Sequence, residues 1–126
     1  MHKSKLAGFI IDCQTSDLEP AANFWGSALG MAVRDLPPGE GEIYKKLEDT
    51  SHGLHIEVQK VSHPSRVHLD IETDDIAAEV LRLEKLGARR IQMVHTWWVM
   101  EAPTGQRFCV VRASSEDFAA KAHQWP

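Results

Sequence analysis

A histidine and two carboxylates alternate with apolar residues in a short segment near the middle of the chain. The segment RVHLDIETDD, residues 66–75, places His68, Asp70 and Glu72 two residues apart. In a β-strand this spacing directs the three polar side chains to one face and the intervening apolar ones to the other. Imidazole and carboxylate groups bind divalent metals and transfer protons, so this strand is a candidate for either chemistry.

A second histidine and carboxylate pair occurs in the segment LHIEVQ, where His55 and Glu57 would share one strand face. The two cysteines, Cys13 and Cys109, are too few and too far apart for a disulfide framework or a CxxC site. They are expected to be reduced thiols that pack as small apolar side chains.

The composition restricts the class of protein. A chain of 126 residues with 43% hydrophobic and 25% charged residues is typical of one globular domain, expected to span residues 1–126. The net charge of −4 gives no electrostatic reason to expect a nucleic acid or an anionic membrane as partner, which leaves a small molecule or another protein. The first residues resemble neither a secretory signal nor a membrane span, so the cytoplasm is expected.

An internal repeat with an offset of 58 positions organises these residues. The offset aligns FIIDCQTSDLEP with VHLDIETDDIAA, so that Ile10 corresponds to His68 and Asp12 to Asp70. Each copy then continues into an amphipathic helix whose buried stripe has i, i+4 and i+7 spacing: Leu18, Ala22 and Trp25 in one, Ile76, Val80 and Leu83 in the other.

The ends of these helices carry recognisable signals. Ser16 and Glu19 have capping-box spacing at the start of the first helix, and Asp74 or Asp75 would cap the second. Gly30 suits the left-handed conformation at the end of the first helix, as Gly87 does for the second. After each helix, short β-like runs separated by turns predict three strands: 32–35, 43–48 and 54–61, then 89–94, 97–101 and 107–112.

The pattern predicts an α+β fold of two tandem βαβββ modules, at about residues 6–61 and 66–112, followed by a C-terminal helix at about 114–124. Two curved sheets side by side would form a mixed-sheet cup with the helices outside. Polar groups in such a cup are the default candidates for a ligand site. The residues expected in the pocket are Ile10, Asp12, His55, Glu57, His68, Asp70, Trp98 and Cys109, with a basic partner such as Arg107 near the aspartates.

The chain resembles the vicinal oxygen chelate superfamily, which includes glyoxalases, extradiol dioxygenases and bleomycin- and fosfomycin-resistance proteins. The resemblance covers residues 6–112 and rests on DLEPAANFWGSALG, VHLDIETDD with a helix ending in LGA, and APTGQRF. It is strongest to the glyoxalase-like branch. The resemblance implies the cup described above, a small-molecule ligand and a homodimer. The cup would be closed either within one chain or by the exchange of modules between two chains.

The resemblance also implies a divalent metal held by side chains of the first, fourth, fifth and eighth strands. His68 and Glu57 match two of these positions, whereas Ile10 occupies the first and Cys109 stands where the family has glutamate. The hydrocarbon side chain of Ile10 cannot bind a metal, so no metal is favoured. If one binds, the ligands would be Glu57, His68 and Cys109, with Zn, Ni, Mn or Fe as the ion.

Two functions follow as alternatives. In the first, the chain is a glyoxalase-like binding protein with a degenerate metal site that sequesters a small organic ligand, aromatic ones included. In the second, it is a glyoxalase-type lyase or isomerase, or another enzyme of the superfamily, with an atypical metal site at Glu57 and His68. Acid/base work by His68 without a metal, and an auxiliary module that acts by association, also remain open.

Overall fold

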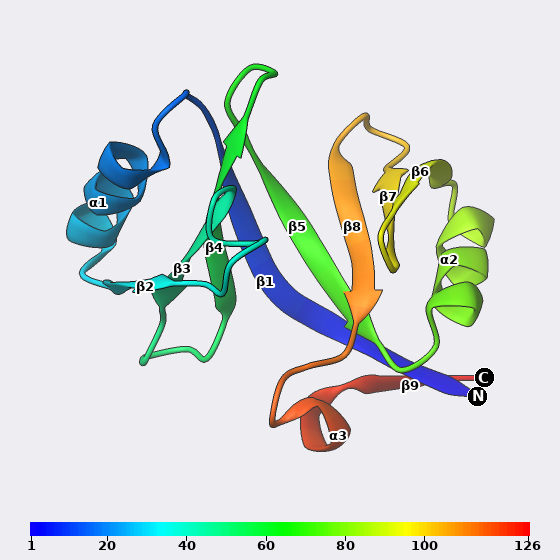
Figure 1. Ribbon diagram of the computed structural model, residues 1–126. Coiled ribbons are helices and arrows are strands. Elements are labelled where there is room, and N and C mark those ends of the chain that lie inside the picture. The colour runs from blue at the N-terminus through cyan, green and yellow to red at the C-terminus, as the bar shows by residue number, and fades with distance from the viewer. The chain divides into compact units, whose positions relative to one another are not determined.

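The computed structural model describes residues 1–126, which form nine strands and three helices (Figure 1). The elements are β1 (His2–Gln14), α1 (Leu18–Leu29), β2 (Ala32–Asp35), β3 (Tyr44–Glu48), β4 (His55–Val61), β5 (Arg66–Thr73), α2 (Ile76–Lys85), β6 (Arg89–Val94), β7 (Trp97–Glu101), β8 (Arg107–Arg112), α3 (Phe118–Lys121) and β9 (His123–Trp125). The α+β class with two βαβββ repeats is therefore confirmed. None of the three helices has the length and apolar character needed to span a lipid bilayer.

The chain divides into two compact units. We call residues 8–67 the first unit, and residues 1–7 together with 68–126 the second unit. The division places the start of β1 with the second repeat, although the sequence predicted a first module that begins at about residue 6.

In the first unit, the strand order is β2-β3-β4-β1, with β4 parallel to β1 and the other pairs antiparallel. The helix α1 packs on one face of this sheet (Figure 1). The buried core between them is apolar, and Trp25 packs against it as its position on the helix predicted. Its buried members are Ile11, Leu18, Ala22, Leu47, Ile56 and Val58.

In the second unit, the order is β5-β8-β7-β6, with β5 parallel to β8 and the other pairs antiparallel. The helix α2 packs on this sheet through Val80 and Leu83, which meet Met100 and Val110 in a smaller apolar core. The two units thus repeat one arrangement of strands and helix.

The helix caps differ from the prediction at one end. Asp17, rather than Ser16, caps α1, because its carboxylate accepts a hydrogen bond from the Glu19 backbone N–H. Asp75 caps α2 and accepts from the Ala78 N–H at 3.0 Å, as one of the two predicted alternatives. Gly30 ends α1 with φ 69°, a left-handed conformation that glycine adopts without the strain of a side chain.

The predicted C-terminal helix at 114–124 is wrong in extent. The helix α3 covers only Phe118–Lys121, and the chain then extends as β9, which pairs antiparallel with residues 2–4 of β1. The start of the segment, at residues 114 and 115, is instead held against Glu72 of β5. Its buried carboxylate accepts hydrogen bonds from the backbone N–H groups of Ser114 and Ser115 and from the Ser115 hydroxyl.

A buried charged network lies where β9, β1 and α2 of the second unit meet. The fully buried Glu79 carboxylate contacts His2 Nε2 at 2.8 Å and accepts two hydrogen bonds of 2.8 Å from Arg82. The Arg82 guanidinium also stacks on the Trp125 ring at 3.9 Å, and the Trp125 indole donates to Ser4. Burial acts to raise the pKa of Glu79, but the hydrogen bonds from Arg82, His2 and Ser4 outweigh it and hold that pKa below its usual value.

Candidate functional site

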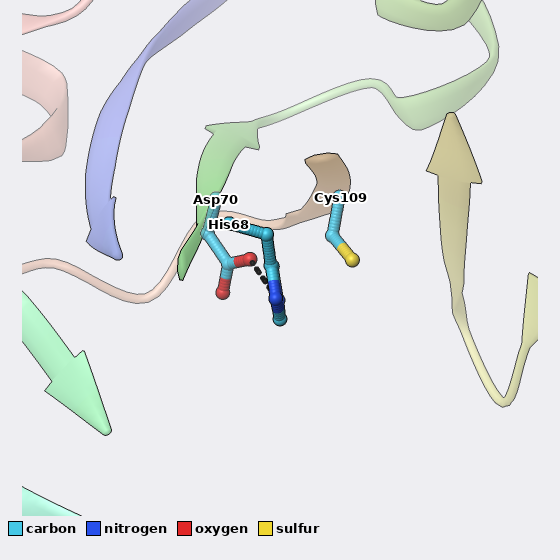
Figure 2. A group of neighbouring side chains, drawn as sticks. All are labelled: His68, Asp70 and Cys109. Carbon is cyan, nitrogen blue, oxygen red and sulfur yellow. Dashed lines mark ion pairs between the residues drawn. The ribbon is translucent and has the colours of Figure 1, made fainter. Parts of the chain in front are cut away.

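Three different donor atoms meet on the sheet of the second unit. Asp70 of β5 and Cys109 of β8 are register partners on adjacent parallel strands, and His68 lies two residues before Asp70 on the same face. The three side chains extend to the same side of these strands (Figure 2). Their nearest ligand atoms, one from each residue, all lie within 4.8 Å of one another.

The environment of this cluster is enclosed. Asp70 and Cys109 are each 8% exposed, and the side chain of His68 is 12% exposed. The His68 Nε2 atom lies 3.6 Å from Asp70 Oδ1, so the two form an ion pair when the imidazole is protonated. An imidazole, a carboxylate and a thiol held together in this way could bind a metal or transfer a proton.

The first unit brings together the other predicted pocket residues. Ile10 of β1 is opposite Glu57 of β4, and Asp12 is two residues further along β1 on the same face. Within β4, His55 Nε2 lies 3.1 Å from Glu57 Oε2. This is the sheet face opposite to Ile11, Ile56 and the apolar core under α1, as predicted from the alternation.

Arg66 is a residue of this face that the sequence analysis missed. Its guanidinium Nε lies 3.5 Å from Oδ2 of Asp12, a carboxylate that is only 2% exposed. The predicted partner, Arg107, instead pairs with Glu101 at 3.2 Å. The signal was present in the sequence, since Arg66 shares the period-two face of His68 at the start of the same strand.

The assignment of Trp98 to the pocket is wrong. Trp98 packs against the apolar core under α2, and the guanidinium of Arg90 lies 5.3 Å from the centre of its ring. The register pairs Val99 with Cys109, so Trp97, two residues before Val99, has the strand parity of Cys109. Adjacent residues of a strand point to opposite faces, so the sequence predicts that Trp97 and Trp98 differ in face. The register of β7 against β8 decides which of the two faces α2.

A surface hollow of about 580 Å³ occurs elsewhere in the first unit. Residues 14–16, Ile43 and residues 60–62 line it, and none of them is a predicted pocket residue. Lys60 is the single ionisable side chain of the lining. The hollow therefore lacks the clustered ionisable side chains that distinguish the two sheet faces.

The donor set can be tested against the metal that the superfamily resemblance implies. Six-coordinate Mg²⁺ and Mn²⁺ prefer several oxygen and nitrogen ligands, whereas Ile10 offers none and Cys109 offers sulfur. Imidazole, carboxylate and thiolate are, however, the three ligand types of four-coordinate zinc sites. The residues therefore fit zinc and do not fit a hard divalent ion.

The sequence matches the model of the glyoxalase-like domain family over residues 8–111. The chain belongs to this family, a branch of the vicinal oxygen chelate superfamily. The predicted family is thus confirmed. No curated protein matches the sequence of the chain.

Solved structures share the fold at low sequence identity. An NAD-dependent benzaldehyde dehydrogenase from Legionella pneumophila superposes with a TM-score of 0.60 at 9% identity, covering 83% of this chain and 99% of its own. A methylmalonyl-CoA epimerase from Mycobacterium tuberculosis gives 0.59 at 16% identity, with 91% of both chains covered. A methylmalonyl-CoA epimerase from Streptomyces coelicolor in complex with 2-nitronate-propionyl-CoA gives 0.55 at 16%, covering 87% of this chain and 98% of its own.

Proposed function

We propose that the chain binds a small organic ligand on the polar sheet face of the first unit, opposite α1. The observation that carries this proposal is the enclosure of ionisable side chains on that face. These are Asp12, which is 2% exposed, and Glu57, whose side chain is 15% exposed. Burying ionisable groups costs free energy, so enclosed ionisable side chains that lie together on one face are candidates for a functional site.

The chemistry of this face favours a ligand with both polar and apolar parts. Ile10 contributes buried apolar surface, while His55 and Glu57 offer hydrogen-bonding groups. A solved epimerase of the same fold holds a propionyl-CoA derivative. We therefore place acyl thioesters and glutathione conjugates in the first set of compounds to test, together with aromatic compounds and antibiotics.

The proposal is tested by thermal unfolding with each compound in turn. A ligand that binds only the folded protein at about 100 times its dissociation constant contributes roughly 2.7 kcal/mol, which raises the melting temperature by several degrees. Glu57→Gln and His55→Gln should reduce this shift. Glu19→Gln, an exposed change on α1, should preserve it. If no compound raises the melting temperature, or if the shift is the same in all variants, the proposal fails.

An enzyme of the lyase or isomerase type is the second candidate. It is favoured by the three donor atoms within 4.8 Å in the second unit, because a divalent metal there would supply a Lewis acid for a bound substrate. His68 would then be one of the side chains that hold the metal, and the chain's own part would be to orient the substrate beside it. In the absence of a metal, His68 Nε2 could instead hold or receive a proton. Turnover that persists in His68→Gln would exclude both roles for His68.

A further inference from the structure

We propose that His68, Asp70 and Cys109 form a zinc site contained within the second unit, with Asp70 as a ligand that the superfamily pattern does not contain. The sequence led to the expectation that no metal binds, with Glu57, His68 and Cys109 as the only candidate ligands. The proposal differs because it adds Asp70 to the ligands and does not include Glu57. It also stands apart from the proposed organic ligand, because the metal alone is sufficient to test it.

The backbone explains why Asp70 joins the set. Parallel pairing of β5 with β8 makes Asp70 the register partner of Cys109, so the two side chains stand next to each other on one face. The strand period of two then adds His68 to the same face, and Figure 2 shows the three side chains directed to one side. Two strands held by backbone hydrogen bonds thus fix the positions of all three donors.

The distances are compatible with a tetrahedral ion. Zinc bonds of about 2.0–2.3 Å place neighbouring ligand atoms roughly 3.3–3.7 Å apart. The His68 and Asp70 atoms are already 3.6 Å apart, and no pair in the trio exceeds 4.8 Å. Closing the remaining gap of about 1 Å requires a side-chain adjustment and no movement of the strands.

The donor types favour zinc over harder ions. A thiolate is a soft ligand, and Mg²⁺ and Mn²⁺ prefer oxygen. With 8% exposure at Asp70 and Cys109, the site also excludes most of the water that a Mg²⁺ ion retains. Three protein ligands leave a fourth position open, which is the pattern of catalytic rather than structural zinc sites.

The repeat supplies a matched control. Asp12 occupies the position equivalent to Asp70, 58 residues earlier in the sequence, but its neighbour is the Arg66 guanidinium at 3.5 Å. Cys13 provides a second control, because it is the other free thiol of the chain and lies on β1. Burial raises the pKa of this thiol, a hydrogen bond with Trp25 opposes the shift, and the charge of Asp12 adds to it. Neither control residue belongs to the proposed trio.

The experiment titrates metal-free protein with Zn²⁺ and with Co²⁺. We expect one ion per chain and, with Co²⁺, the near-ultraviolet thiolate-to-cobalt charge-transfer absorption, which disappears in Cys109→Ser. Asp70→Asn and His68→Gln should each weaken Zn²⁺ affinity by about 100-fold, the upper end of the loss caused by removing a supporting group. Asp12→Asn and Cys13→Ser should change it by less than about 2-fold.

Several results would overturn the assignment. Zinc binding with the same affinity in Asp70→Asn, or weakened by Asp12→Asn, would remove Asp70 from the ligand set. A cobalt complex without the thiolate absorption would remove Cys109. Mg²⁺ or Mn²⁺ that displaces Zn²⁺ at equal concentration would contradict the selectivity. Circular dichroism of each variant before titration separates a lost ligand from a lost fold, and zinc should raise the melting temperature of the unaltered chain.

Discussion

The two units repeat one order of strands and helix but fill their interiors differently. Six buried apolar side chains form the core of the first unit, together with seven partly buried ones. The core of the second unit has four buried apolar members, and this unit also buries Glu72, Thr73 and Glu79, each with polar partners. The same hydrophobic pattern therefore specifies one topology, while two different sets of interactions stabilise it.

The positions on the polar faces that the repeat relates also differ between the two units, in residue type or in the partner of the side chain. Ile10 and His68 are equivalent by the offset, as are Asp12 and Asp70. In the first unit the aspartate faces the Arg66 guanidinium. In the second unit it lies between an imidazole and a thiol. A single framework position thus serves an ion pair in one unit and a cluster of potential ligands in the other.

The largest expected effect is on the apolar core of the first unit. Leu47 is fully buried, and Leu47→Ala should lower the free energy of unfolding by about 3–4 kcal/mol through lost burial and a residual cavity. Urea denaturation measures this loss, which should be the same at pH 7 and pH 4 because no charge is removed. The control Leu81→Ala, on the exposed side of α2, should cost less than about 0.5 kcal/mol. A loss below about 1 kcal/mol in Leu47→Ala would contradict the comparison.

The next effect is on the charged network of the second unit. Glu79→Ala removes the common partner of His2 and Arg82 and should cost about 3 kcal/mol at pH 7, because it leaves a partly buried guanidinium uncompensated. Glu84→Ala on the same helix, which breaks only the exposed pair with Arg90, should cost less than about 1 kcal/mol.

Acid should weaken the contribution of Glu79. Its pKa is lower in the folded protein, so its ionised form stabilises the fold above the unfolded pKa of about 4.3. That stabilisation is lost as the pH falls through the folded pKa. The difference in unfolding free energy between the unaltered chain and Glu79→Ala should therefore shrink below about pH 4. A difference that stays constant from pH 7 to pH 3 would show that charge plays no part.

The smallest effect concerns the two helix caps, where the units should behave alike. Asp17→Ala and Asp75→Ala each remove a carboxylate that accepts a backbone N–H, at 3.2 and 3.0 Å, and should each cost about 1 kcal/mol. Thermal unfolding of both variants and of Ser16→Ala measures the costs. Ser16→Ala should be within about 0.5 kcal/mol of the unaltered chain, and a larger loss would return the capping role to Ser16.

Local pattern was sufficient for most of the fold. The strands Ala32–Asp35, Arg89–Val94, Trp97–Glu101 and Arg107–Arg112 begin and end where alternation and turn residues predicted. The helix stripes also lie in the expected cores. These features depend on residues close in sequence, so the sequence carries them directly.

The remaining features depend on pairings between distant residues. The face of Trp98 is set by its register against Val110, and the partner of Asp12 by the entry of Arg66 into β5. Likewise, the nearness of Asp70 to Cys109 follows from parallel pairing across 39 residues. The end of the chain forms β9 because residues 123–125 pair with residues 2–4 of β1, at the other end of the sequence. A change of one residue in the register of a strand would move each of its side chains to the opposite face of the sheet.

The pairing of β9 with the start of β1 has a dynamic consequence (Figure 1). The first and last residues of a domain usually fray independently and exchange their amide protons quickly. Here residues 2–4 and 123–125 hydrogen-bond to each other, and His2 and Trp125 share the buried network around Glu79 and Arg82. Neither segment can open without exposing the polar groups of the other, so the two segments form one cooperative unit of local unfolding.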